Sequence, residues 1–581
     1  MRVFLLSRLK IKMEKIAFNL YILVLFSNFY AAYAQENLNV KINDLGRIKG
    51  SLKTTRLGKK IFSFRGVRYA ESPTGKLSFQ PPVPVKPWNE VFDASKEGPA
   101  CPQLNYAIMS EDCLRLNVYT TKLPTENDKV KRPVIVFIHP GGFFSYSGQS
   151  DQFGPEYLLD RDVVLVTINY RIGSLGFLSA DHPRLLGNMG LKDQVIALRW
   201  IKKNINVFGG DPNLVTITGY SAGSGSVTMH LVSPMSRGLF HRAISMSGAV
   251  TYQRLLDTNQ KEMAIKQAEY FNCPTNSVDE IVDCLQTIPA QDIANSIPIF
   301  FEWYRDPILK WTPVIEPEVN GVERFLTEQP INSIREGRVA PVPVIGGVNK
   351  DEFAGLIVFP TEFTRAGNST FLDQWNSDWN HIAPISFQYE RNTSRTQCVS
   401  DELKRFYINN HVTLENIGGI GELYSDAIIM FSEHRFINLL SASSKYPVYY
   451  YHFTYQGRYS HVVWTDTKKP FGVSHHDELM YIFYMSKFPK FVKGDPEILM
   501  VEKMTAIFEN FAKTGKPIPK ENSLFNNVIW KKFTPLQKRY LEINNSCMIM
   551  KNGVINPERM KLWDRLFPLS SRRKYSNNCK H

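Results

Sequence analysis

Five short runs of nearly continuous apolar residues constrain the fold of this chain more than any other feature. They read PVIVFIH (133–139), VVLVTINY (163–170), LVTIT (214–218), PVPVIGG (341–347) and VYYYHFTY (448–455). Strands that are buried on both faces of a largely parallel sheet have this character, whereas half-exposed strands alternate between apolar and polar residues. We therefore predict strands at these five positions.

Helical stretches separate these runs. In residues 193–210, apolar residues recur near the spacing of one helix face, and we expect a helix that begins at Asp193 and ends before Gly209. The alternation predicts an α/β fold in which helices flank a central, mostly parallel sheet. Because no internal repeat or low-complexity linker divides the chain, we expect one domain over residues 35–568, with large insertions, and a basic tail over 569–581.

The N-terminus has the order of a secretory signal peptide. Basic residues precede an apolar run at 16–26, and the small residues Ala32-Tyr33-Ala34 follow it. This order predicts a signal peptide over residues 1–34 and a secreted, extracellular protein. The alternative is an uncleaved anchor, but the apolar run is shorter than the roughly 20 residues that span a bilayer. We expect no membrane span in the mature protein.

The basic charge of the chain does not indicate a nucleic-acid partner. The formal net charge is +14, and the predicted leader, with five basic residues and one acidic residue, contributes +4 of it. The other basic residues are scattered, apart from Arg572-Arg573-Lys574, which indicates a solvated surface rather than a binding stripe. We expect a monomer or a homodimer that binds no nucleic acid.

Secretion permits disulfide bonds and glycosylation. Two pairs of cysteines lie close enough in sequence to close short loops: Cys101 with Cys113, and Cys273 with Cys284. Three cysteines remain, so at least one is free or bonds another chain: Cys398, Cys547 and Cys579. Three sequons predict glycans on surface loops, at Asn368, Asn392 and Asn544.

The segment LVTITGYSAGSG (214–225) holds a candidate nucleophile. The predicted strand is followed by a tight turn and a predicted helix over residues 222–232. A nucleophile elbow requires this context, because Gly219 and Gly223 permit the close backbone approach around Ser221. A G-x-S-x-G pattern also occurs by chance in a flexible turn, so the assignment depends on partners elsewhere in the chain.

A serine hydroxyl becomes a nucleophile only when a base accepts its proton and an acid orients that base. The acid is expected just after a later strand, where Asp351 and Glu352 lie. The base is expected nearer the C-terminus, where His475 and His476 lie. The order of these residues does not choose within either pair.

Donors for the developing oxyanion are expected on the loop FIHPGGFF (137–144). Gly141 and Gly142 can present exposed backbone N–H groups there, whereas Pro140 has none. The third donor is expected to be the N–H of Ala222, the residue after the candidate nucleophile.

Six longer motifs follow one another along the chain. They are EDCLRLNVY (111–119), NYRIGSLGFLS (169–179), GNMGLKDQ (187–194), FGGDPNLVTITGYSAG (208–223), GVNKDE (347–352) and GVSHHDEL (472–479). In sequence and order they resemble the type-B carboxylesterase/cholinesterase family of α/β-hydrolases, and especially its secreted insect carboxylesterases. The resemblance covers residues 40–565. It implies an α/β-hydrolase fold and a serine carboxylesterase that works through an acyl-enzyme intermediate.

The resemblance also implies roles for single residues. The catalytic residues would be Ser221 as nucleophile, Glu352 rather than Asp351 as acid, and His475 rather than His476 as base. The oxyanion donors would be Gly141, Gly142 and Ala222, with Ser247 near the histidine–acid pair. Family disulfides lie at the positions of the two close pairs, Cys101–Cys113 and Cys273–Cys284.

Two departures separate the chain from true cholinesterases. The loop between Cys101 and Cys113, where those enzymes carry a choline-site tryptophan, contains no tryptophan. Tyr220 stands where many relatives have glutamate and where hormone-specific insect esterases often have glutamine. Capture of a quaternary ammonium therefore lacks its usual groups. We expect the partner to be a small apolar ester, for example a xenobiotic, an odorant or a juvenile hormone ester.

Three features have an alternative interpretation. Six aromatic residues either line an apolar gorge or pack in the core: Phe143, Phe144, Tyr146, Trp303, Tyr304 and Trp311. The family also includes catalytically silent binding and adhesion proteins, but those usually lack a residue of the triad, which is complete here. HHDE (475–478) resembles a metal cluster, but a serine mechanism needs no metal, so we expect neither a metal nor another cofactor.

Overall fold

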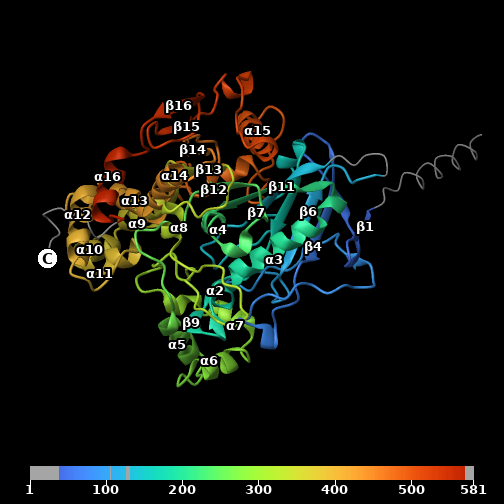
Figure 1. The fold of residues 1–581 in the computed structure, drawn as a ribbon. Helices are drawn as coiled ribbons and strands as arrows, with labels where there is room; N and C mark the ends of the chain where they lie inside the picture. Colours follow the sequence, from blue (N-terminus) through green and yellow to red (C-terminus); the bar gives the residue numbers. More distant parts are fainter. Residues whose placement is uncertain (1–37, 105, 126–130, 570–581) are drawn as a thin grey trace, which may run out of the picture.

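The computed structural model describes residues 38–104, 106–125 and 131–569. The predicted signal peptide, and the predicted tail beyond residue 569, lie outside the described residues. The centre of the molecule is an 11-stranded sheet (Figure 1). Its strands, in spatial order, are β16 (Met548–Asn552), β15 (Arg539–Ile543), β14 (Val448–Phe453), β13 (Val344–Asn349), β12 (Arg242–Met246), β11 (Gly210–Tyr220), β7 (Arg132–Ile138), β8 (Val164–Ile168), β6 (Arg115–Thr120), β4 (Lys60–Arg68) and β3 (Ser51–Thr54).

All five predicted strands are confirmed, as β7, β8, β11, β13 and β14. Neighbours are parallel from β15 to β8, and antiparallel pairs occur at both edges of the sheet. The mostly parallel sheet of the predicted α/β class is therefore confirmed. The prediction missed β12, which is inserted between β11 and β13. Its sequence, RAISM, is short and mixes polar with apolar residues.

Alternate side chains of the central strands face two different apolar layers, as the twofold repeat of a strand dictates. On β7, Val134, Val136 and Ile138 belong to one layer, whereas Ile135 and Phe137 belong to the other. The first layer includes residues of α3 (Met189–Asn204), α4 (Ala222–His230) and α14 (Phe431–Ser443). The second includes residues of α15 (Ile498–Thr514). Burial on both faces explains why these strands read as continuous apolar runs.

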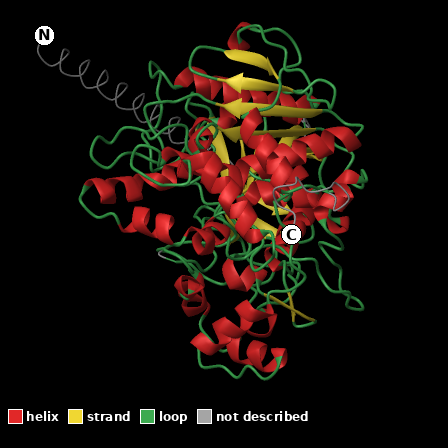
Figure 2. Cartoon of the chain, turned by 90° about the vertical axis from the view of Figure 1, so that its left-hand side faces the viewer, coloured by secondary structure: helices red, strands yellow, loops and turns green. Residues whose placement is uncertain are grey.

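Most of the remaining helices lie in insertions between strands. Helices α5 (Lys261–Tyr270), α6 (Val278–Leu285) and α7 (Ala290–Asn295) gather at one end of the molecule, away from the sheet (Figures 1 and 2). A second group follows β13 in the sequence and lies at the left of the molecule in Figure 1: α9 (Val358–Arg365), α10 (Thr370–Ser377), α11 (Trp379–Ser386), α12 (Thr396–Ile408) and α13 (Gly418–Ser425). Shorter or separate elements are α2 (Gly173–Phe177), α8 (Pro330–Arg335), α16 (Pro557–Leu566), and the small sheets of β1 (Asn39–Ile42), β2 (Gly46–Lys49) and β5 (Phe92–Asp93), and of β9 (Ser179–His182) and β10 (Leu185–Leu186).

The predicted start of the helix at Asp193 is wrong. Helix α3 begins at Met189, and Asp193 lies inside it, fully buried. Its carboxylate does not cap the helix, because both of its oxygens bind Arg171: Oδ2 accepts from the backbone N–H and from Nε at 2.9 Å each, and Oδ1 accepts from Nη2 at 2.7 Å. This buried pair ties the NYRIG segment after β8 to α3.

We expect the substitution Asp193→Asn to destabilise the fold by about 3–5 kcal/mol, because it leaves the buried Arg171 guanidinium without its counter-charge. The free energy of unfolding from urea titration measures this. Asp283→Asn is the matched control, since Asp283 pairs with Arg184 on the surface at 2.6 Å and should cost less than about 1 kcal/mol. Equal losses in the two variants would contradict the prediction.

The structure contains the disulfides Cys101–Cys113 and Cys273–Cys284. Cys398 is also disulfide-bonded, whereas Cys547 is a free, half-buried thiol. Of the sequon asparagines, Asn368 and Asn392 are exposed and Asn544 is half-buried. Within the part of the chain that the structure describes, no helix has the length and apolar character needed to cross a bilayer.

Candidate active site

Ser221 alone forms the turn between β11 and α4. Its backbone has φ 56° and ψ −119°, a conformation that non-glycine residues rarely adopt. The Ser221 N–H donates to the carbonyl oxygen of Met246 at the end of β12, at 2.9 Å. The side chain therefore lies at the carboxyl end of the parallel strands, where ligands bind in open α/β sheets.

Gly219 and Gly223 flank this turn because no other residue fits. A Cβ atom at Gly219 would lie 2.2 Å from the carbonyl oxygen of Gly223. A Cβ atom at Gly223 would lie 2.1 Å from the carbonyl oxygen of Ile138, at the end of β7. Both distances are far below van der Waals contact, so the two glycines of the motif allow α4 to start directly against the sheet.

The segments after β13 and β14 bring Glu352 and His475 together. Nδ1 of His475 lies 2.5 Å from Oε2 of Glu352, and the backbone N–H of His475 donates to the Glu352 carbonyl oxygen at 2.9 Å. The other carboxylate oxygen, Oε1, accepts from Oγ of Ser247 at 2.7 Å and from the N–H of Asn349 at 2.6 Å. With both oxygens bound, the carboxylate is fixed in the orientation that holds the imidazole.

The neighbouring members of each pair have other contacts. Oδ2 of Asp351 accepts from the N–H of Val473 at 2.8 Å, which joins the acid segment to the histidine segment. His476 is half-buried, and its Nδ1 lies 3.5 Å from the hydroxyl of Tyr146. Burial lowers the pKa of His476 well below its usual value, and the nearby His475 adds to this effect.

Ser221 and His475 line one cavity of about 170 Å³. Nε2 of His475 is buried and has no hydrogen-bond partner among the described residues. The lining is mostly apolar, and none of the described residues in it carries a carboxylate, an ammonium or a guanidinium group. The lining consists of Gly141, Gly142, Phe143, Phe144, Ser145, Ser221, Ala222, Gly248, Tyr252, Ile308, Leu309, Phe353, Ile428, Ile429, His475 and His476.

The backbone N–H groups of Gly141, Gly142 and Ala222 lie at this cavity and have no acceptor within the described part of the chain. Gly141 and Gly142 have φ angles of 114° and 59°. The Gly141 carbonyl oxygen accepts from the N–H groups of Phe144 and Ser145 at 2.9 and 3.0 Å, which closes a tight turn. A Cβ at Gly141 would lie 2.0 Å from the Ser145 carbonyl oxygen. The turn thus requires glycine and leaves its amides unpaired.

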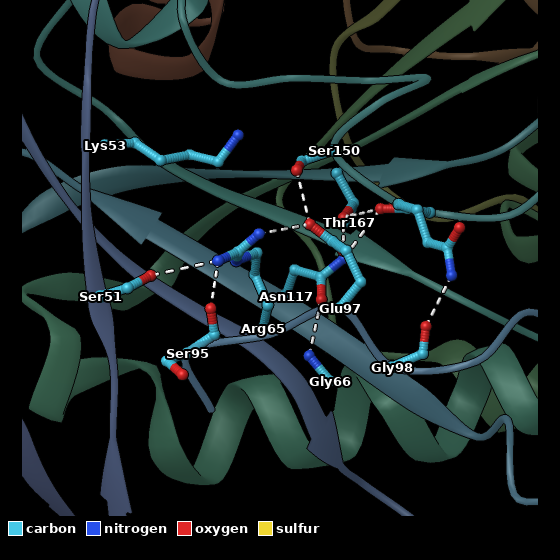
Figure 3. A network of polar contacts seen from close by, with 12 residues as sticks. Ser51, Lys53, Arg65, Gly66, Ser95, Glu97, Gly98, Asn117, Ser150 and Thr167 are labelled. Atoms are coloured by element: carbon cyan, nitrogen blue, oxygen red, sulfur yellow. Dashed lines mark hydrogen bonds and ion pairs between the residues drawn. The ribbon is translucent and has the colours of Figure 1, made fainter. Parts of the chain in front are cut away.

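Polar contacts fix the loop that continues from the Gly141–Ser145 turn, at Gly148 and Ser150 (Figure 3). Nδ2 of Asn117, on β6, donates to the carbonyl oxygen of Gly148 at 2.8 Å and to Oγ1 of Thr167 at 3.0 Å. Its Oδ1 accepts from the N–H of Gly66 at 2.8 Å, and Oγ of Ser150 donates to Glu97 at 2.5 Å. Asn117 belongs to the EDCLRLNVY motif, so this motif contributes to the site by holding the loop against β4, β6 and β8.

Two buried carboxyl groups near Glu352 were not predicted. Burial raises the pKa of Glu433 and of Glu478 well above the usual range, and the charge of Glu352 raises both further. Glu433 accepts a hydrogen bond from Oγ of Ser245 at 3.3 Å, and Glu478 accepts one from the Tyr451 hydroxyl at 2.8 Å. Glu478 lies in the GVSHHDEL motif, whereas Glu433 lies on α14 without a sequence signal.

Of the six aromatic candidates, Phe143 and Phe144 line the cavity, whereas the other four are not among its described lining residues. Trp311 is fully buried and packs against Phe300, with ring centroids 4.8 Å apart. Trp303 and Tyr304 pack against Phe371 of α10, and Tyr146 contacts His476. Sequence analysis missed the lining residues Tyr252, Ile308, Leu309, Phe353, Ile428 and Ile429. Most of them come from insertions, whose sequences carry no motif.

Comparisons with known proteins agree with this architecture. A model of the carboxylesterase family matches residues 36–563. Esterase E4 of Myzus persicae is 37% identical over 500 residues, which cover 84% of this chain and 88% of that protein. A juvenile hormone esterase of Tribolium castaneum is 35% identical, covering 90% of this chain and 91% of that protein. The crystal structure of juvenile hormone esterase from Manduca sexta, with OTFP covalently attached, matches with a TM-score of 0.79 and 28% identity, covering 92% of this chain and 100% of that chain.

Proposed function

Because this chain belongs to the carboxylesterase family and is a carboxylic ester hydrolase, we propose that it cleaves small apolar esters through an acyl-enzyme formed on Ser221. The observation that carries the proposal is the convergence of three separate segments on one cavity. Ser221 stands at its strained turn, His475 is held by Glu352 at 2.5 Å, and unpaired backbone amides surround the same space.

The proposed reaction has two acyl-transfer steps. Oγ of Ser221 attacks the ester carbonyl carbon while Nε2 of His475 accepts its proton, and Glu352 stabilises the imidazolium that forms. The N–H groups of Gly141, Gly142 and Ala222 stabilise the oxyanion of the tetrahedral intermediate. The imidazolium then protonates the departing alcohol. Water, activated by the same imidazole, releases the acid and restores the serine.

The lining of the cavity supports a neutral, apolar substrate. Phe143, Phe144 and Phe353 supply aromatic surface, and Ile428 and Ile429 supply aliphatic surface. A quaternary ammonium would find no carboxylate among the described residues of the lining. Xenobiotic, odorant and hormone esters, including juvenile hormone esters, fit this chemistry. The apolar N-terminal segment and the disulfides support secretion as the setting in which the enzyme meets such esters.

We expect purified protein to hydrolyse uncharged short-chain aryl esters and to disfavour choline esters of the same acyl group. A desolvated cation–π contact to the choline group is worth about 2 kcal/mol. Without it, kcat/KM for the choline ester should be about 30-fold lower than kcat/KM for the aryl ester. Steady-state kinetics on a panel graded by acyl length, with each acyl group offered as an aryl and as a choline ester, measure the ratio. Preference for the choline ester would contradict the proposed substrate class, and no hydrolysis of any ester would favour a silent binding protein.

A further inference from the structure

Tyr220 is the residue before the proposed nucleophile. Many related enzymes have glutamate or glutamine at this position, and the difference suggests a role in substrate choice. Its position does not support such a role. Tyr220 is fully buried and is not among the described residues that line the cavity, although Ser221 and Ala222 are. Its ring lies in the apolar layer that also holds Phe137, Met246 and residues of α15.

The Tyr220 hydroxyl binds the segment that carries the proposed base. It accepts from the backbone N–H of His476 at 2.8 Å and from Nδ2 of Asn349 at 3.2 Å. The same Nδ2 donates to the carbonyl oxygen of Ser474 at 2.8 Å. The peptide groups on both sides of His475 are thus held by one tyrosine and one asparagine.

The tyrosine ring also contacts the imidazole itself. The centroids of the Tyr220 and His475 rings are 4.9 Å apart, and the Tyr220 hydroxyl lies 3.5 Å from Nδ1 of His475. Phe353 packs on His475 as well, at 4.3 Å. His476 has φ 80°, an unfavourable value for a residue with a side chain, so its backbone needs a partner that fixes this conformation. The hydroxyl of Tyr220 is that partner.

We propose that Tyr220 is a positioning residue, which holds the Ser474–His476 turn so that Nε2 of His475 faces Ser221, and that it does not contact the substrate. The inference rests on the proposed function, because it assigns the base role to His475. Burial raises the pKa of Tyr220 well above its usual value, with a further contribution from the charge of Glu352. The phenol is therefore neutral over the working pH range.

The test is Tyr220→Phe, which keeps the ring and removes only the hydroxyl. We expect kcat on an aryl ester to fall by about 10- to 100-fold, since a misplaced catalytic group costs about that much, with KM within about twofold. Tyr157→Phe is the matched control. The Tyr157 hydroxyl also accepts from a backbone N–H, that of Phe491, at 2.8 Å, but Tyr157 is not among the described residues that line the cavity. Its kcat should be unchanged while its thermal unfolding midpoint shifts as in Tyr220→Phe.

Asn349→Ala supplies a second route to the same turn. As a single variant it should lower kcat. Its effect on kcat should be smaller when Tyr220→Phe is already present, because the effects of coupled residues are not additive. A substrate-specificity role would instead change KM with kcat kept, and a packing role would leave both parameters at wild-type values; either result overturns the inference. If Tyr220→Phe does not fold, an unchanged kcat in Asn349→Ala overturns it.

These outcomes are distinguishable from failure of the proposed function. If the wild type is active and Ser221→Ala is not, the proposed function holds and the Tyr220 variants decide the inference alone. If Ser221→Ala retains wild-type turnover, the proposed function fails and the inference fails with it.

Discussion

Ser221→Ala will lose ester turnover by a factor of about 10⁴ or more, which is the effect of removing the nucleophile from a serine triad. The change deletes one oxygen atom from a turn whose backbone is held independently by the bond to Met246 and by the close approach of Gly219 and Gly223. The fold and the cavity should therefore survive. A loss of 10⁴ corresponds to about 5.4 kcal/mol of transition-state stabilisation.

The measurement is kcat on a short-chain aryl ester, with an unfolding curve to show that the variant is folded. Ser226→Ala is the control, since Ser226 lies on the same helix α4 but its hydroxyl donates to the Ala222 carbonyl oxygen and is not part of the cavity lining. That variant should retain turnover within a few-fold. A folded Ser221→Ala protein with wild-type kcat would exclude the acyl-enzyme mechanism.

His475→Ala is expected to lose turnover to a similar extent, about 10⁴-fold, because the serine hydroxyl then has no base. Nε2 of His475 is buried at the cavity without a partner among the described residues, while Nδ1 is occupied by Glu352. His476→Ala should lose at most about tenfold, through the turn it shares with His475. A dead His476→Ala beside an active His475→Ala would show that the base is His476.

Glu352 should act through His475 and not separately. Glu352→Gln is expected to lower kcat by about 10⁴-fold, because the amide no longer fixes the imidazole tautomer. In the double variant with His475→Ala, the additional loss should be small, since the two residues act as one unit. Multiplied losses in the double variant would show that Glu352 has an independent role.

The strands that position the site could be predicted because buried strands have an apolar composition. A strand covered on both faces is mostly apolar, and the predicted runs in β7, β8, β11, β13 and β14 have this character. The role of the glycines around Ser221 could also be predicted, because only glycine permits such close contacts between backbone segments. By contrast, nothing in the order of residues distinguished Glu352 from Asp351. That choice depends on which carboxylate faces the imidazole once the segments after β13 and β14 meet.

Polar residues with buried partners were the hardest to interpret from the sequence. Asp193 reads as a helix cap, yet it serves Arg171 across the interior, a partner 22 residues away. Tyr220 reads as a candidate specificity residue, yet its hydroxyl points to the backbone of His476. The walls of the cavity were least predictable, because they come from insertions whose helices have no fixed place relative to the sheet until the whole chain has folded.

The most direct test of the account is the site of covalent modification by a fluorophosphonate, which reacts with an activated serine and mimics the acylation step. The protein would be treated until its activity is lost and then digested, and the modified peptide would be identified by mass spectrometry. The Ser221→Ala variant would be treated in parallel. We expect one adduct per chain, on Ser221, and none on the variant. Loss of activity with the adduct on another residue, or full activity with Ser221 modified, would contradict it.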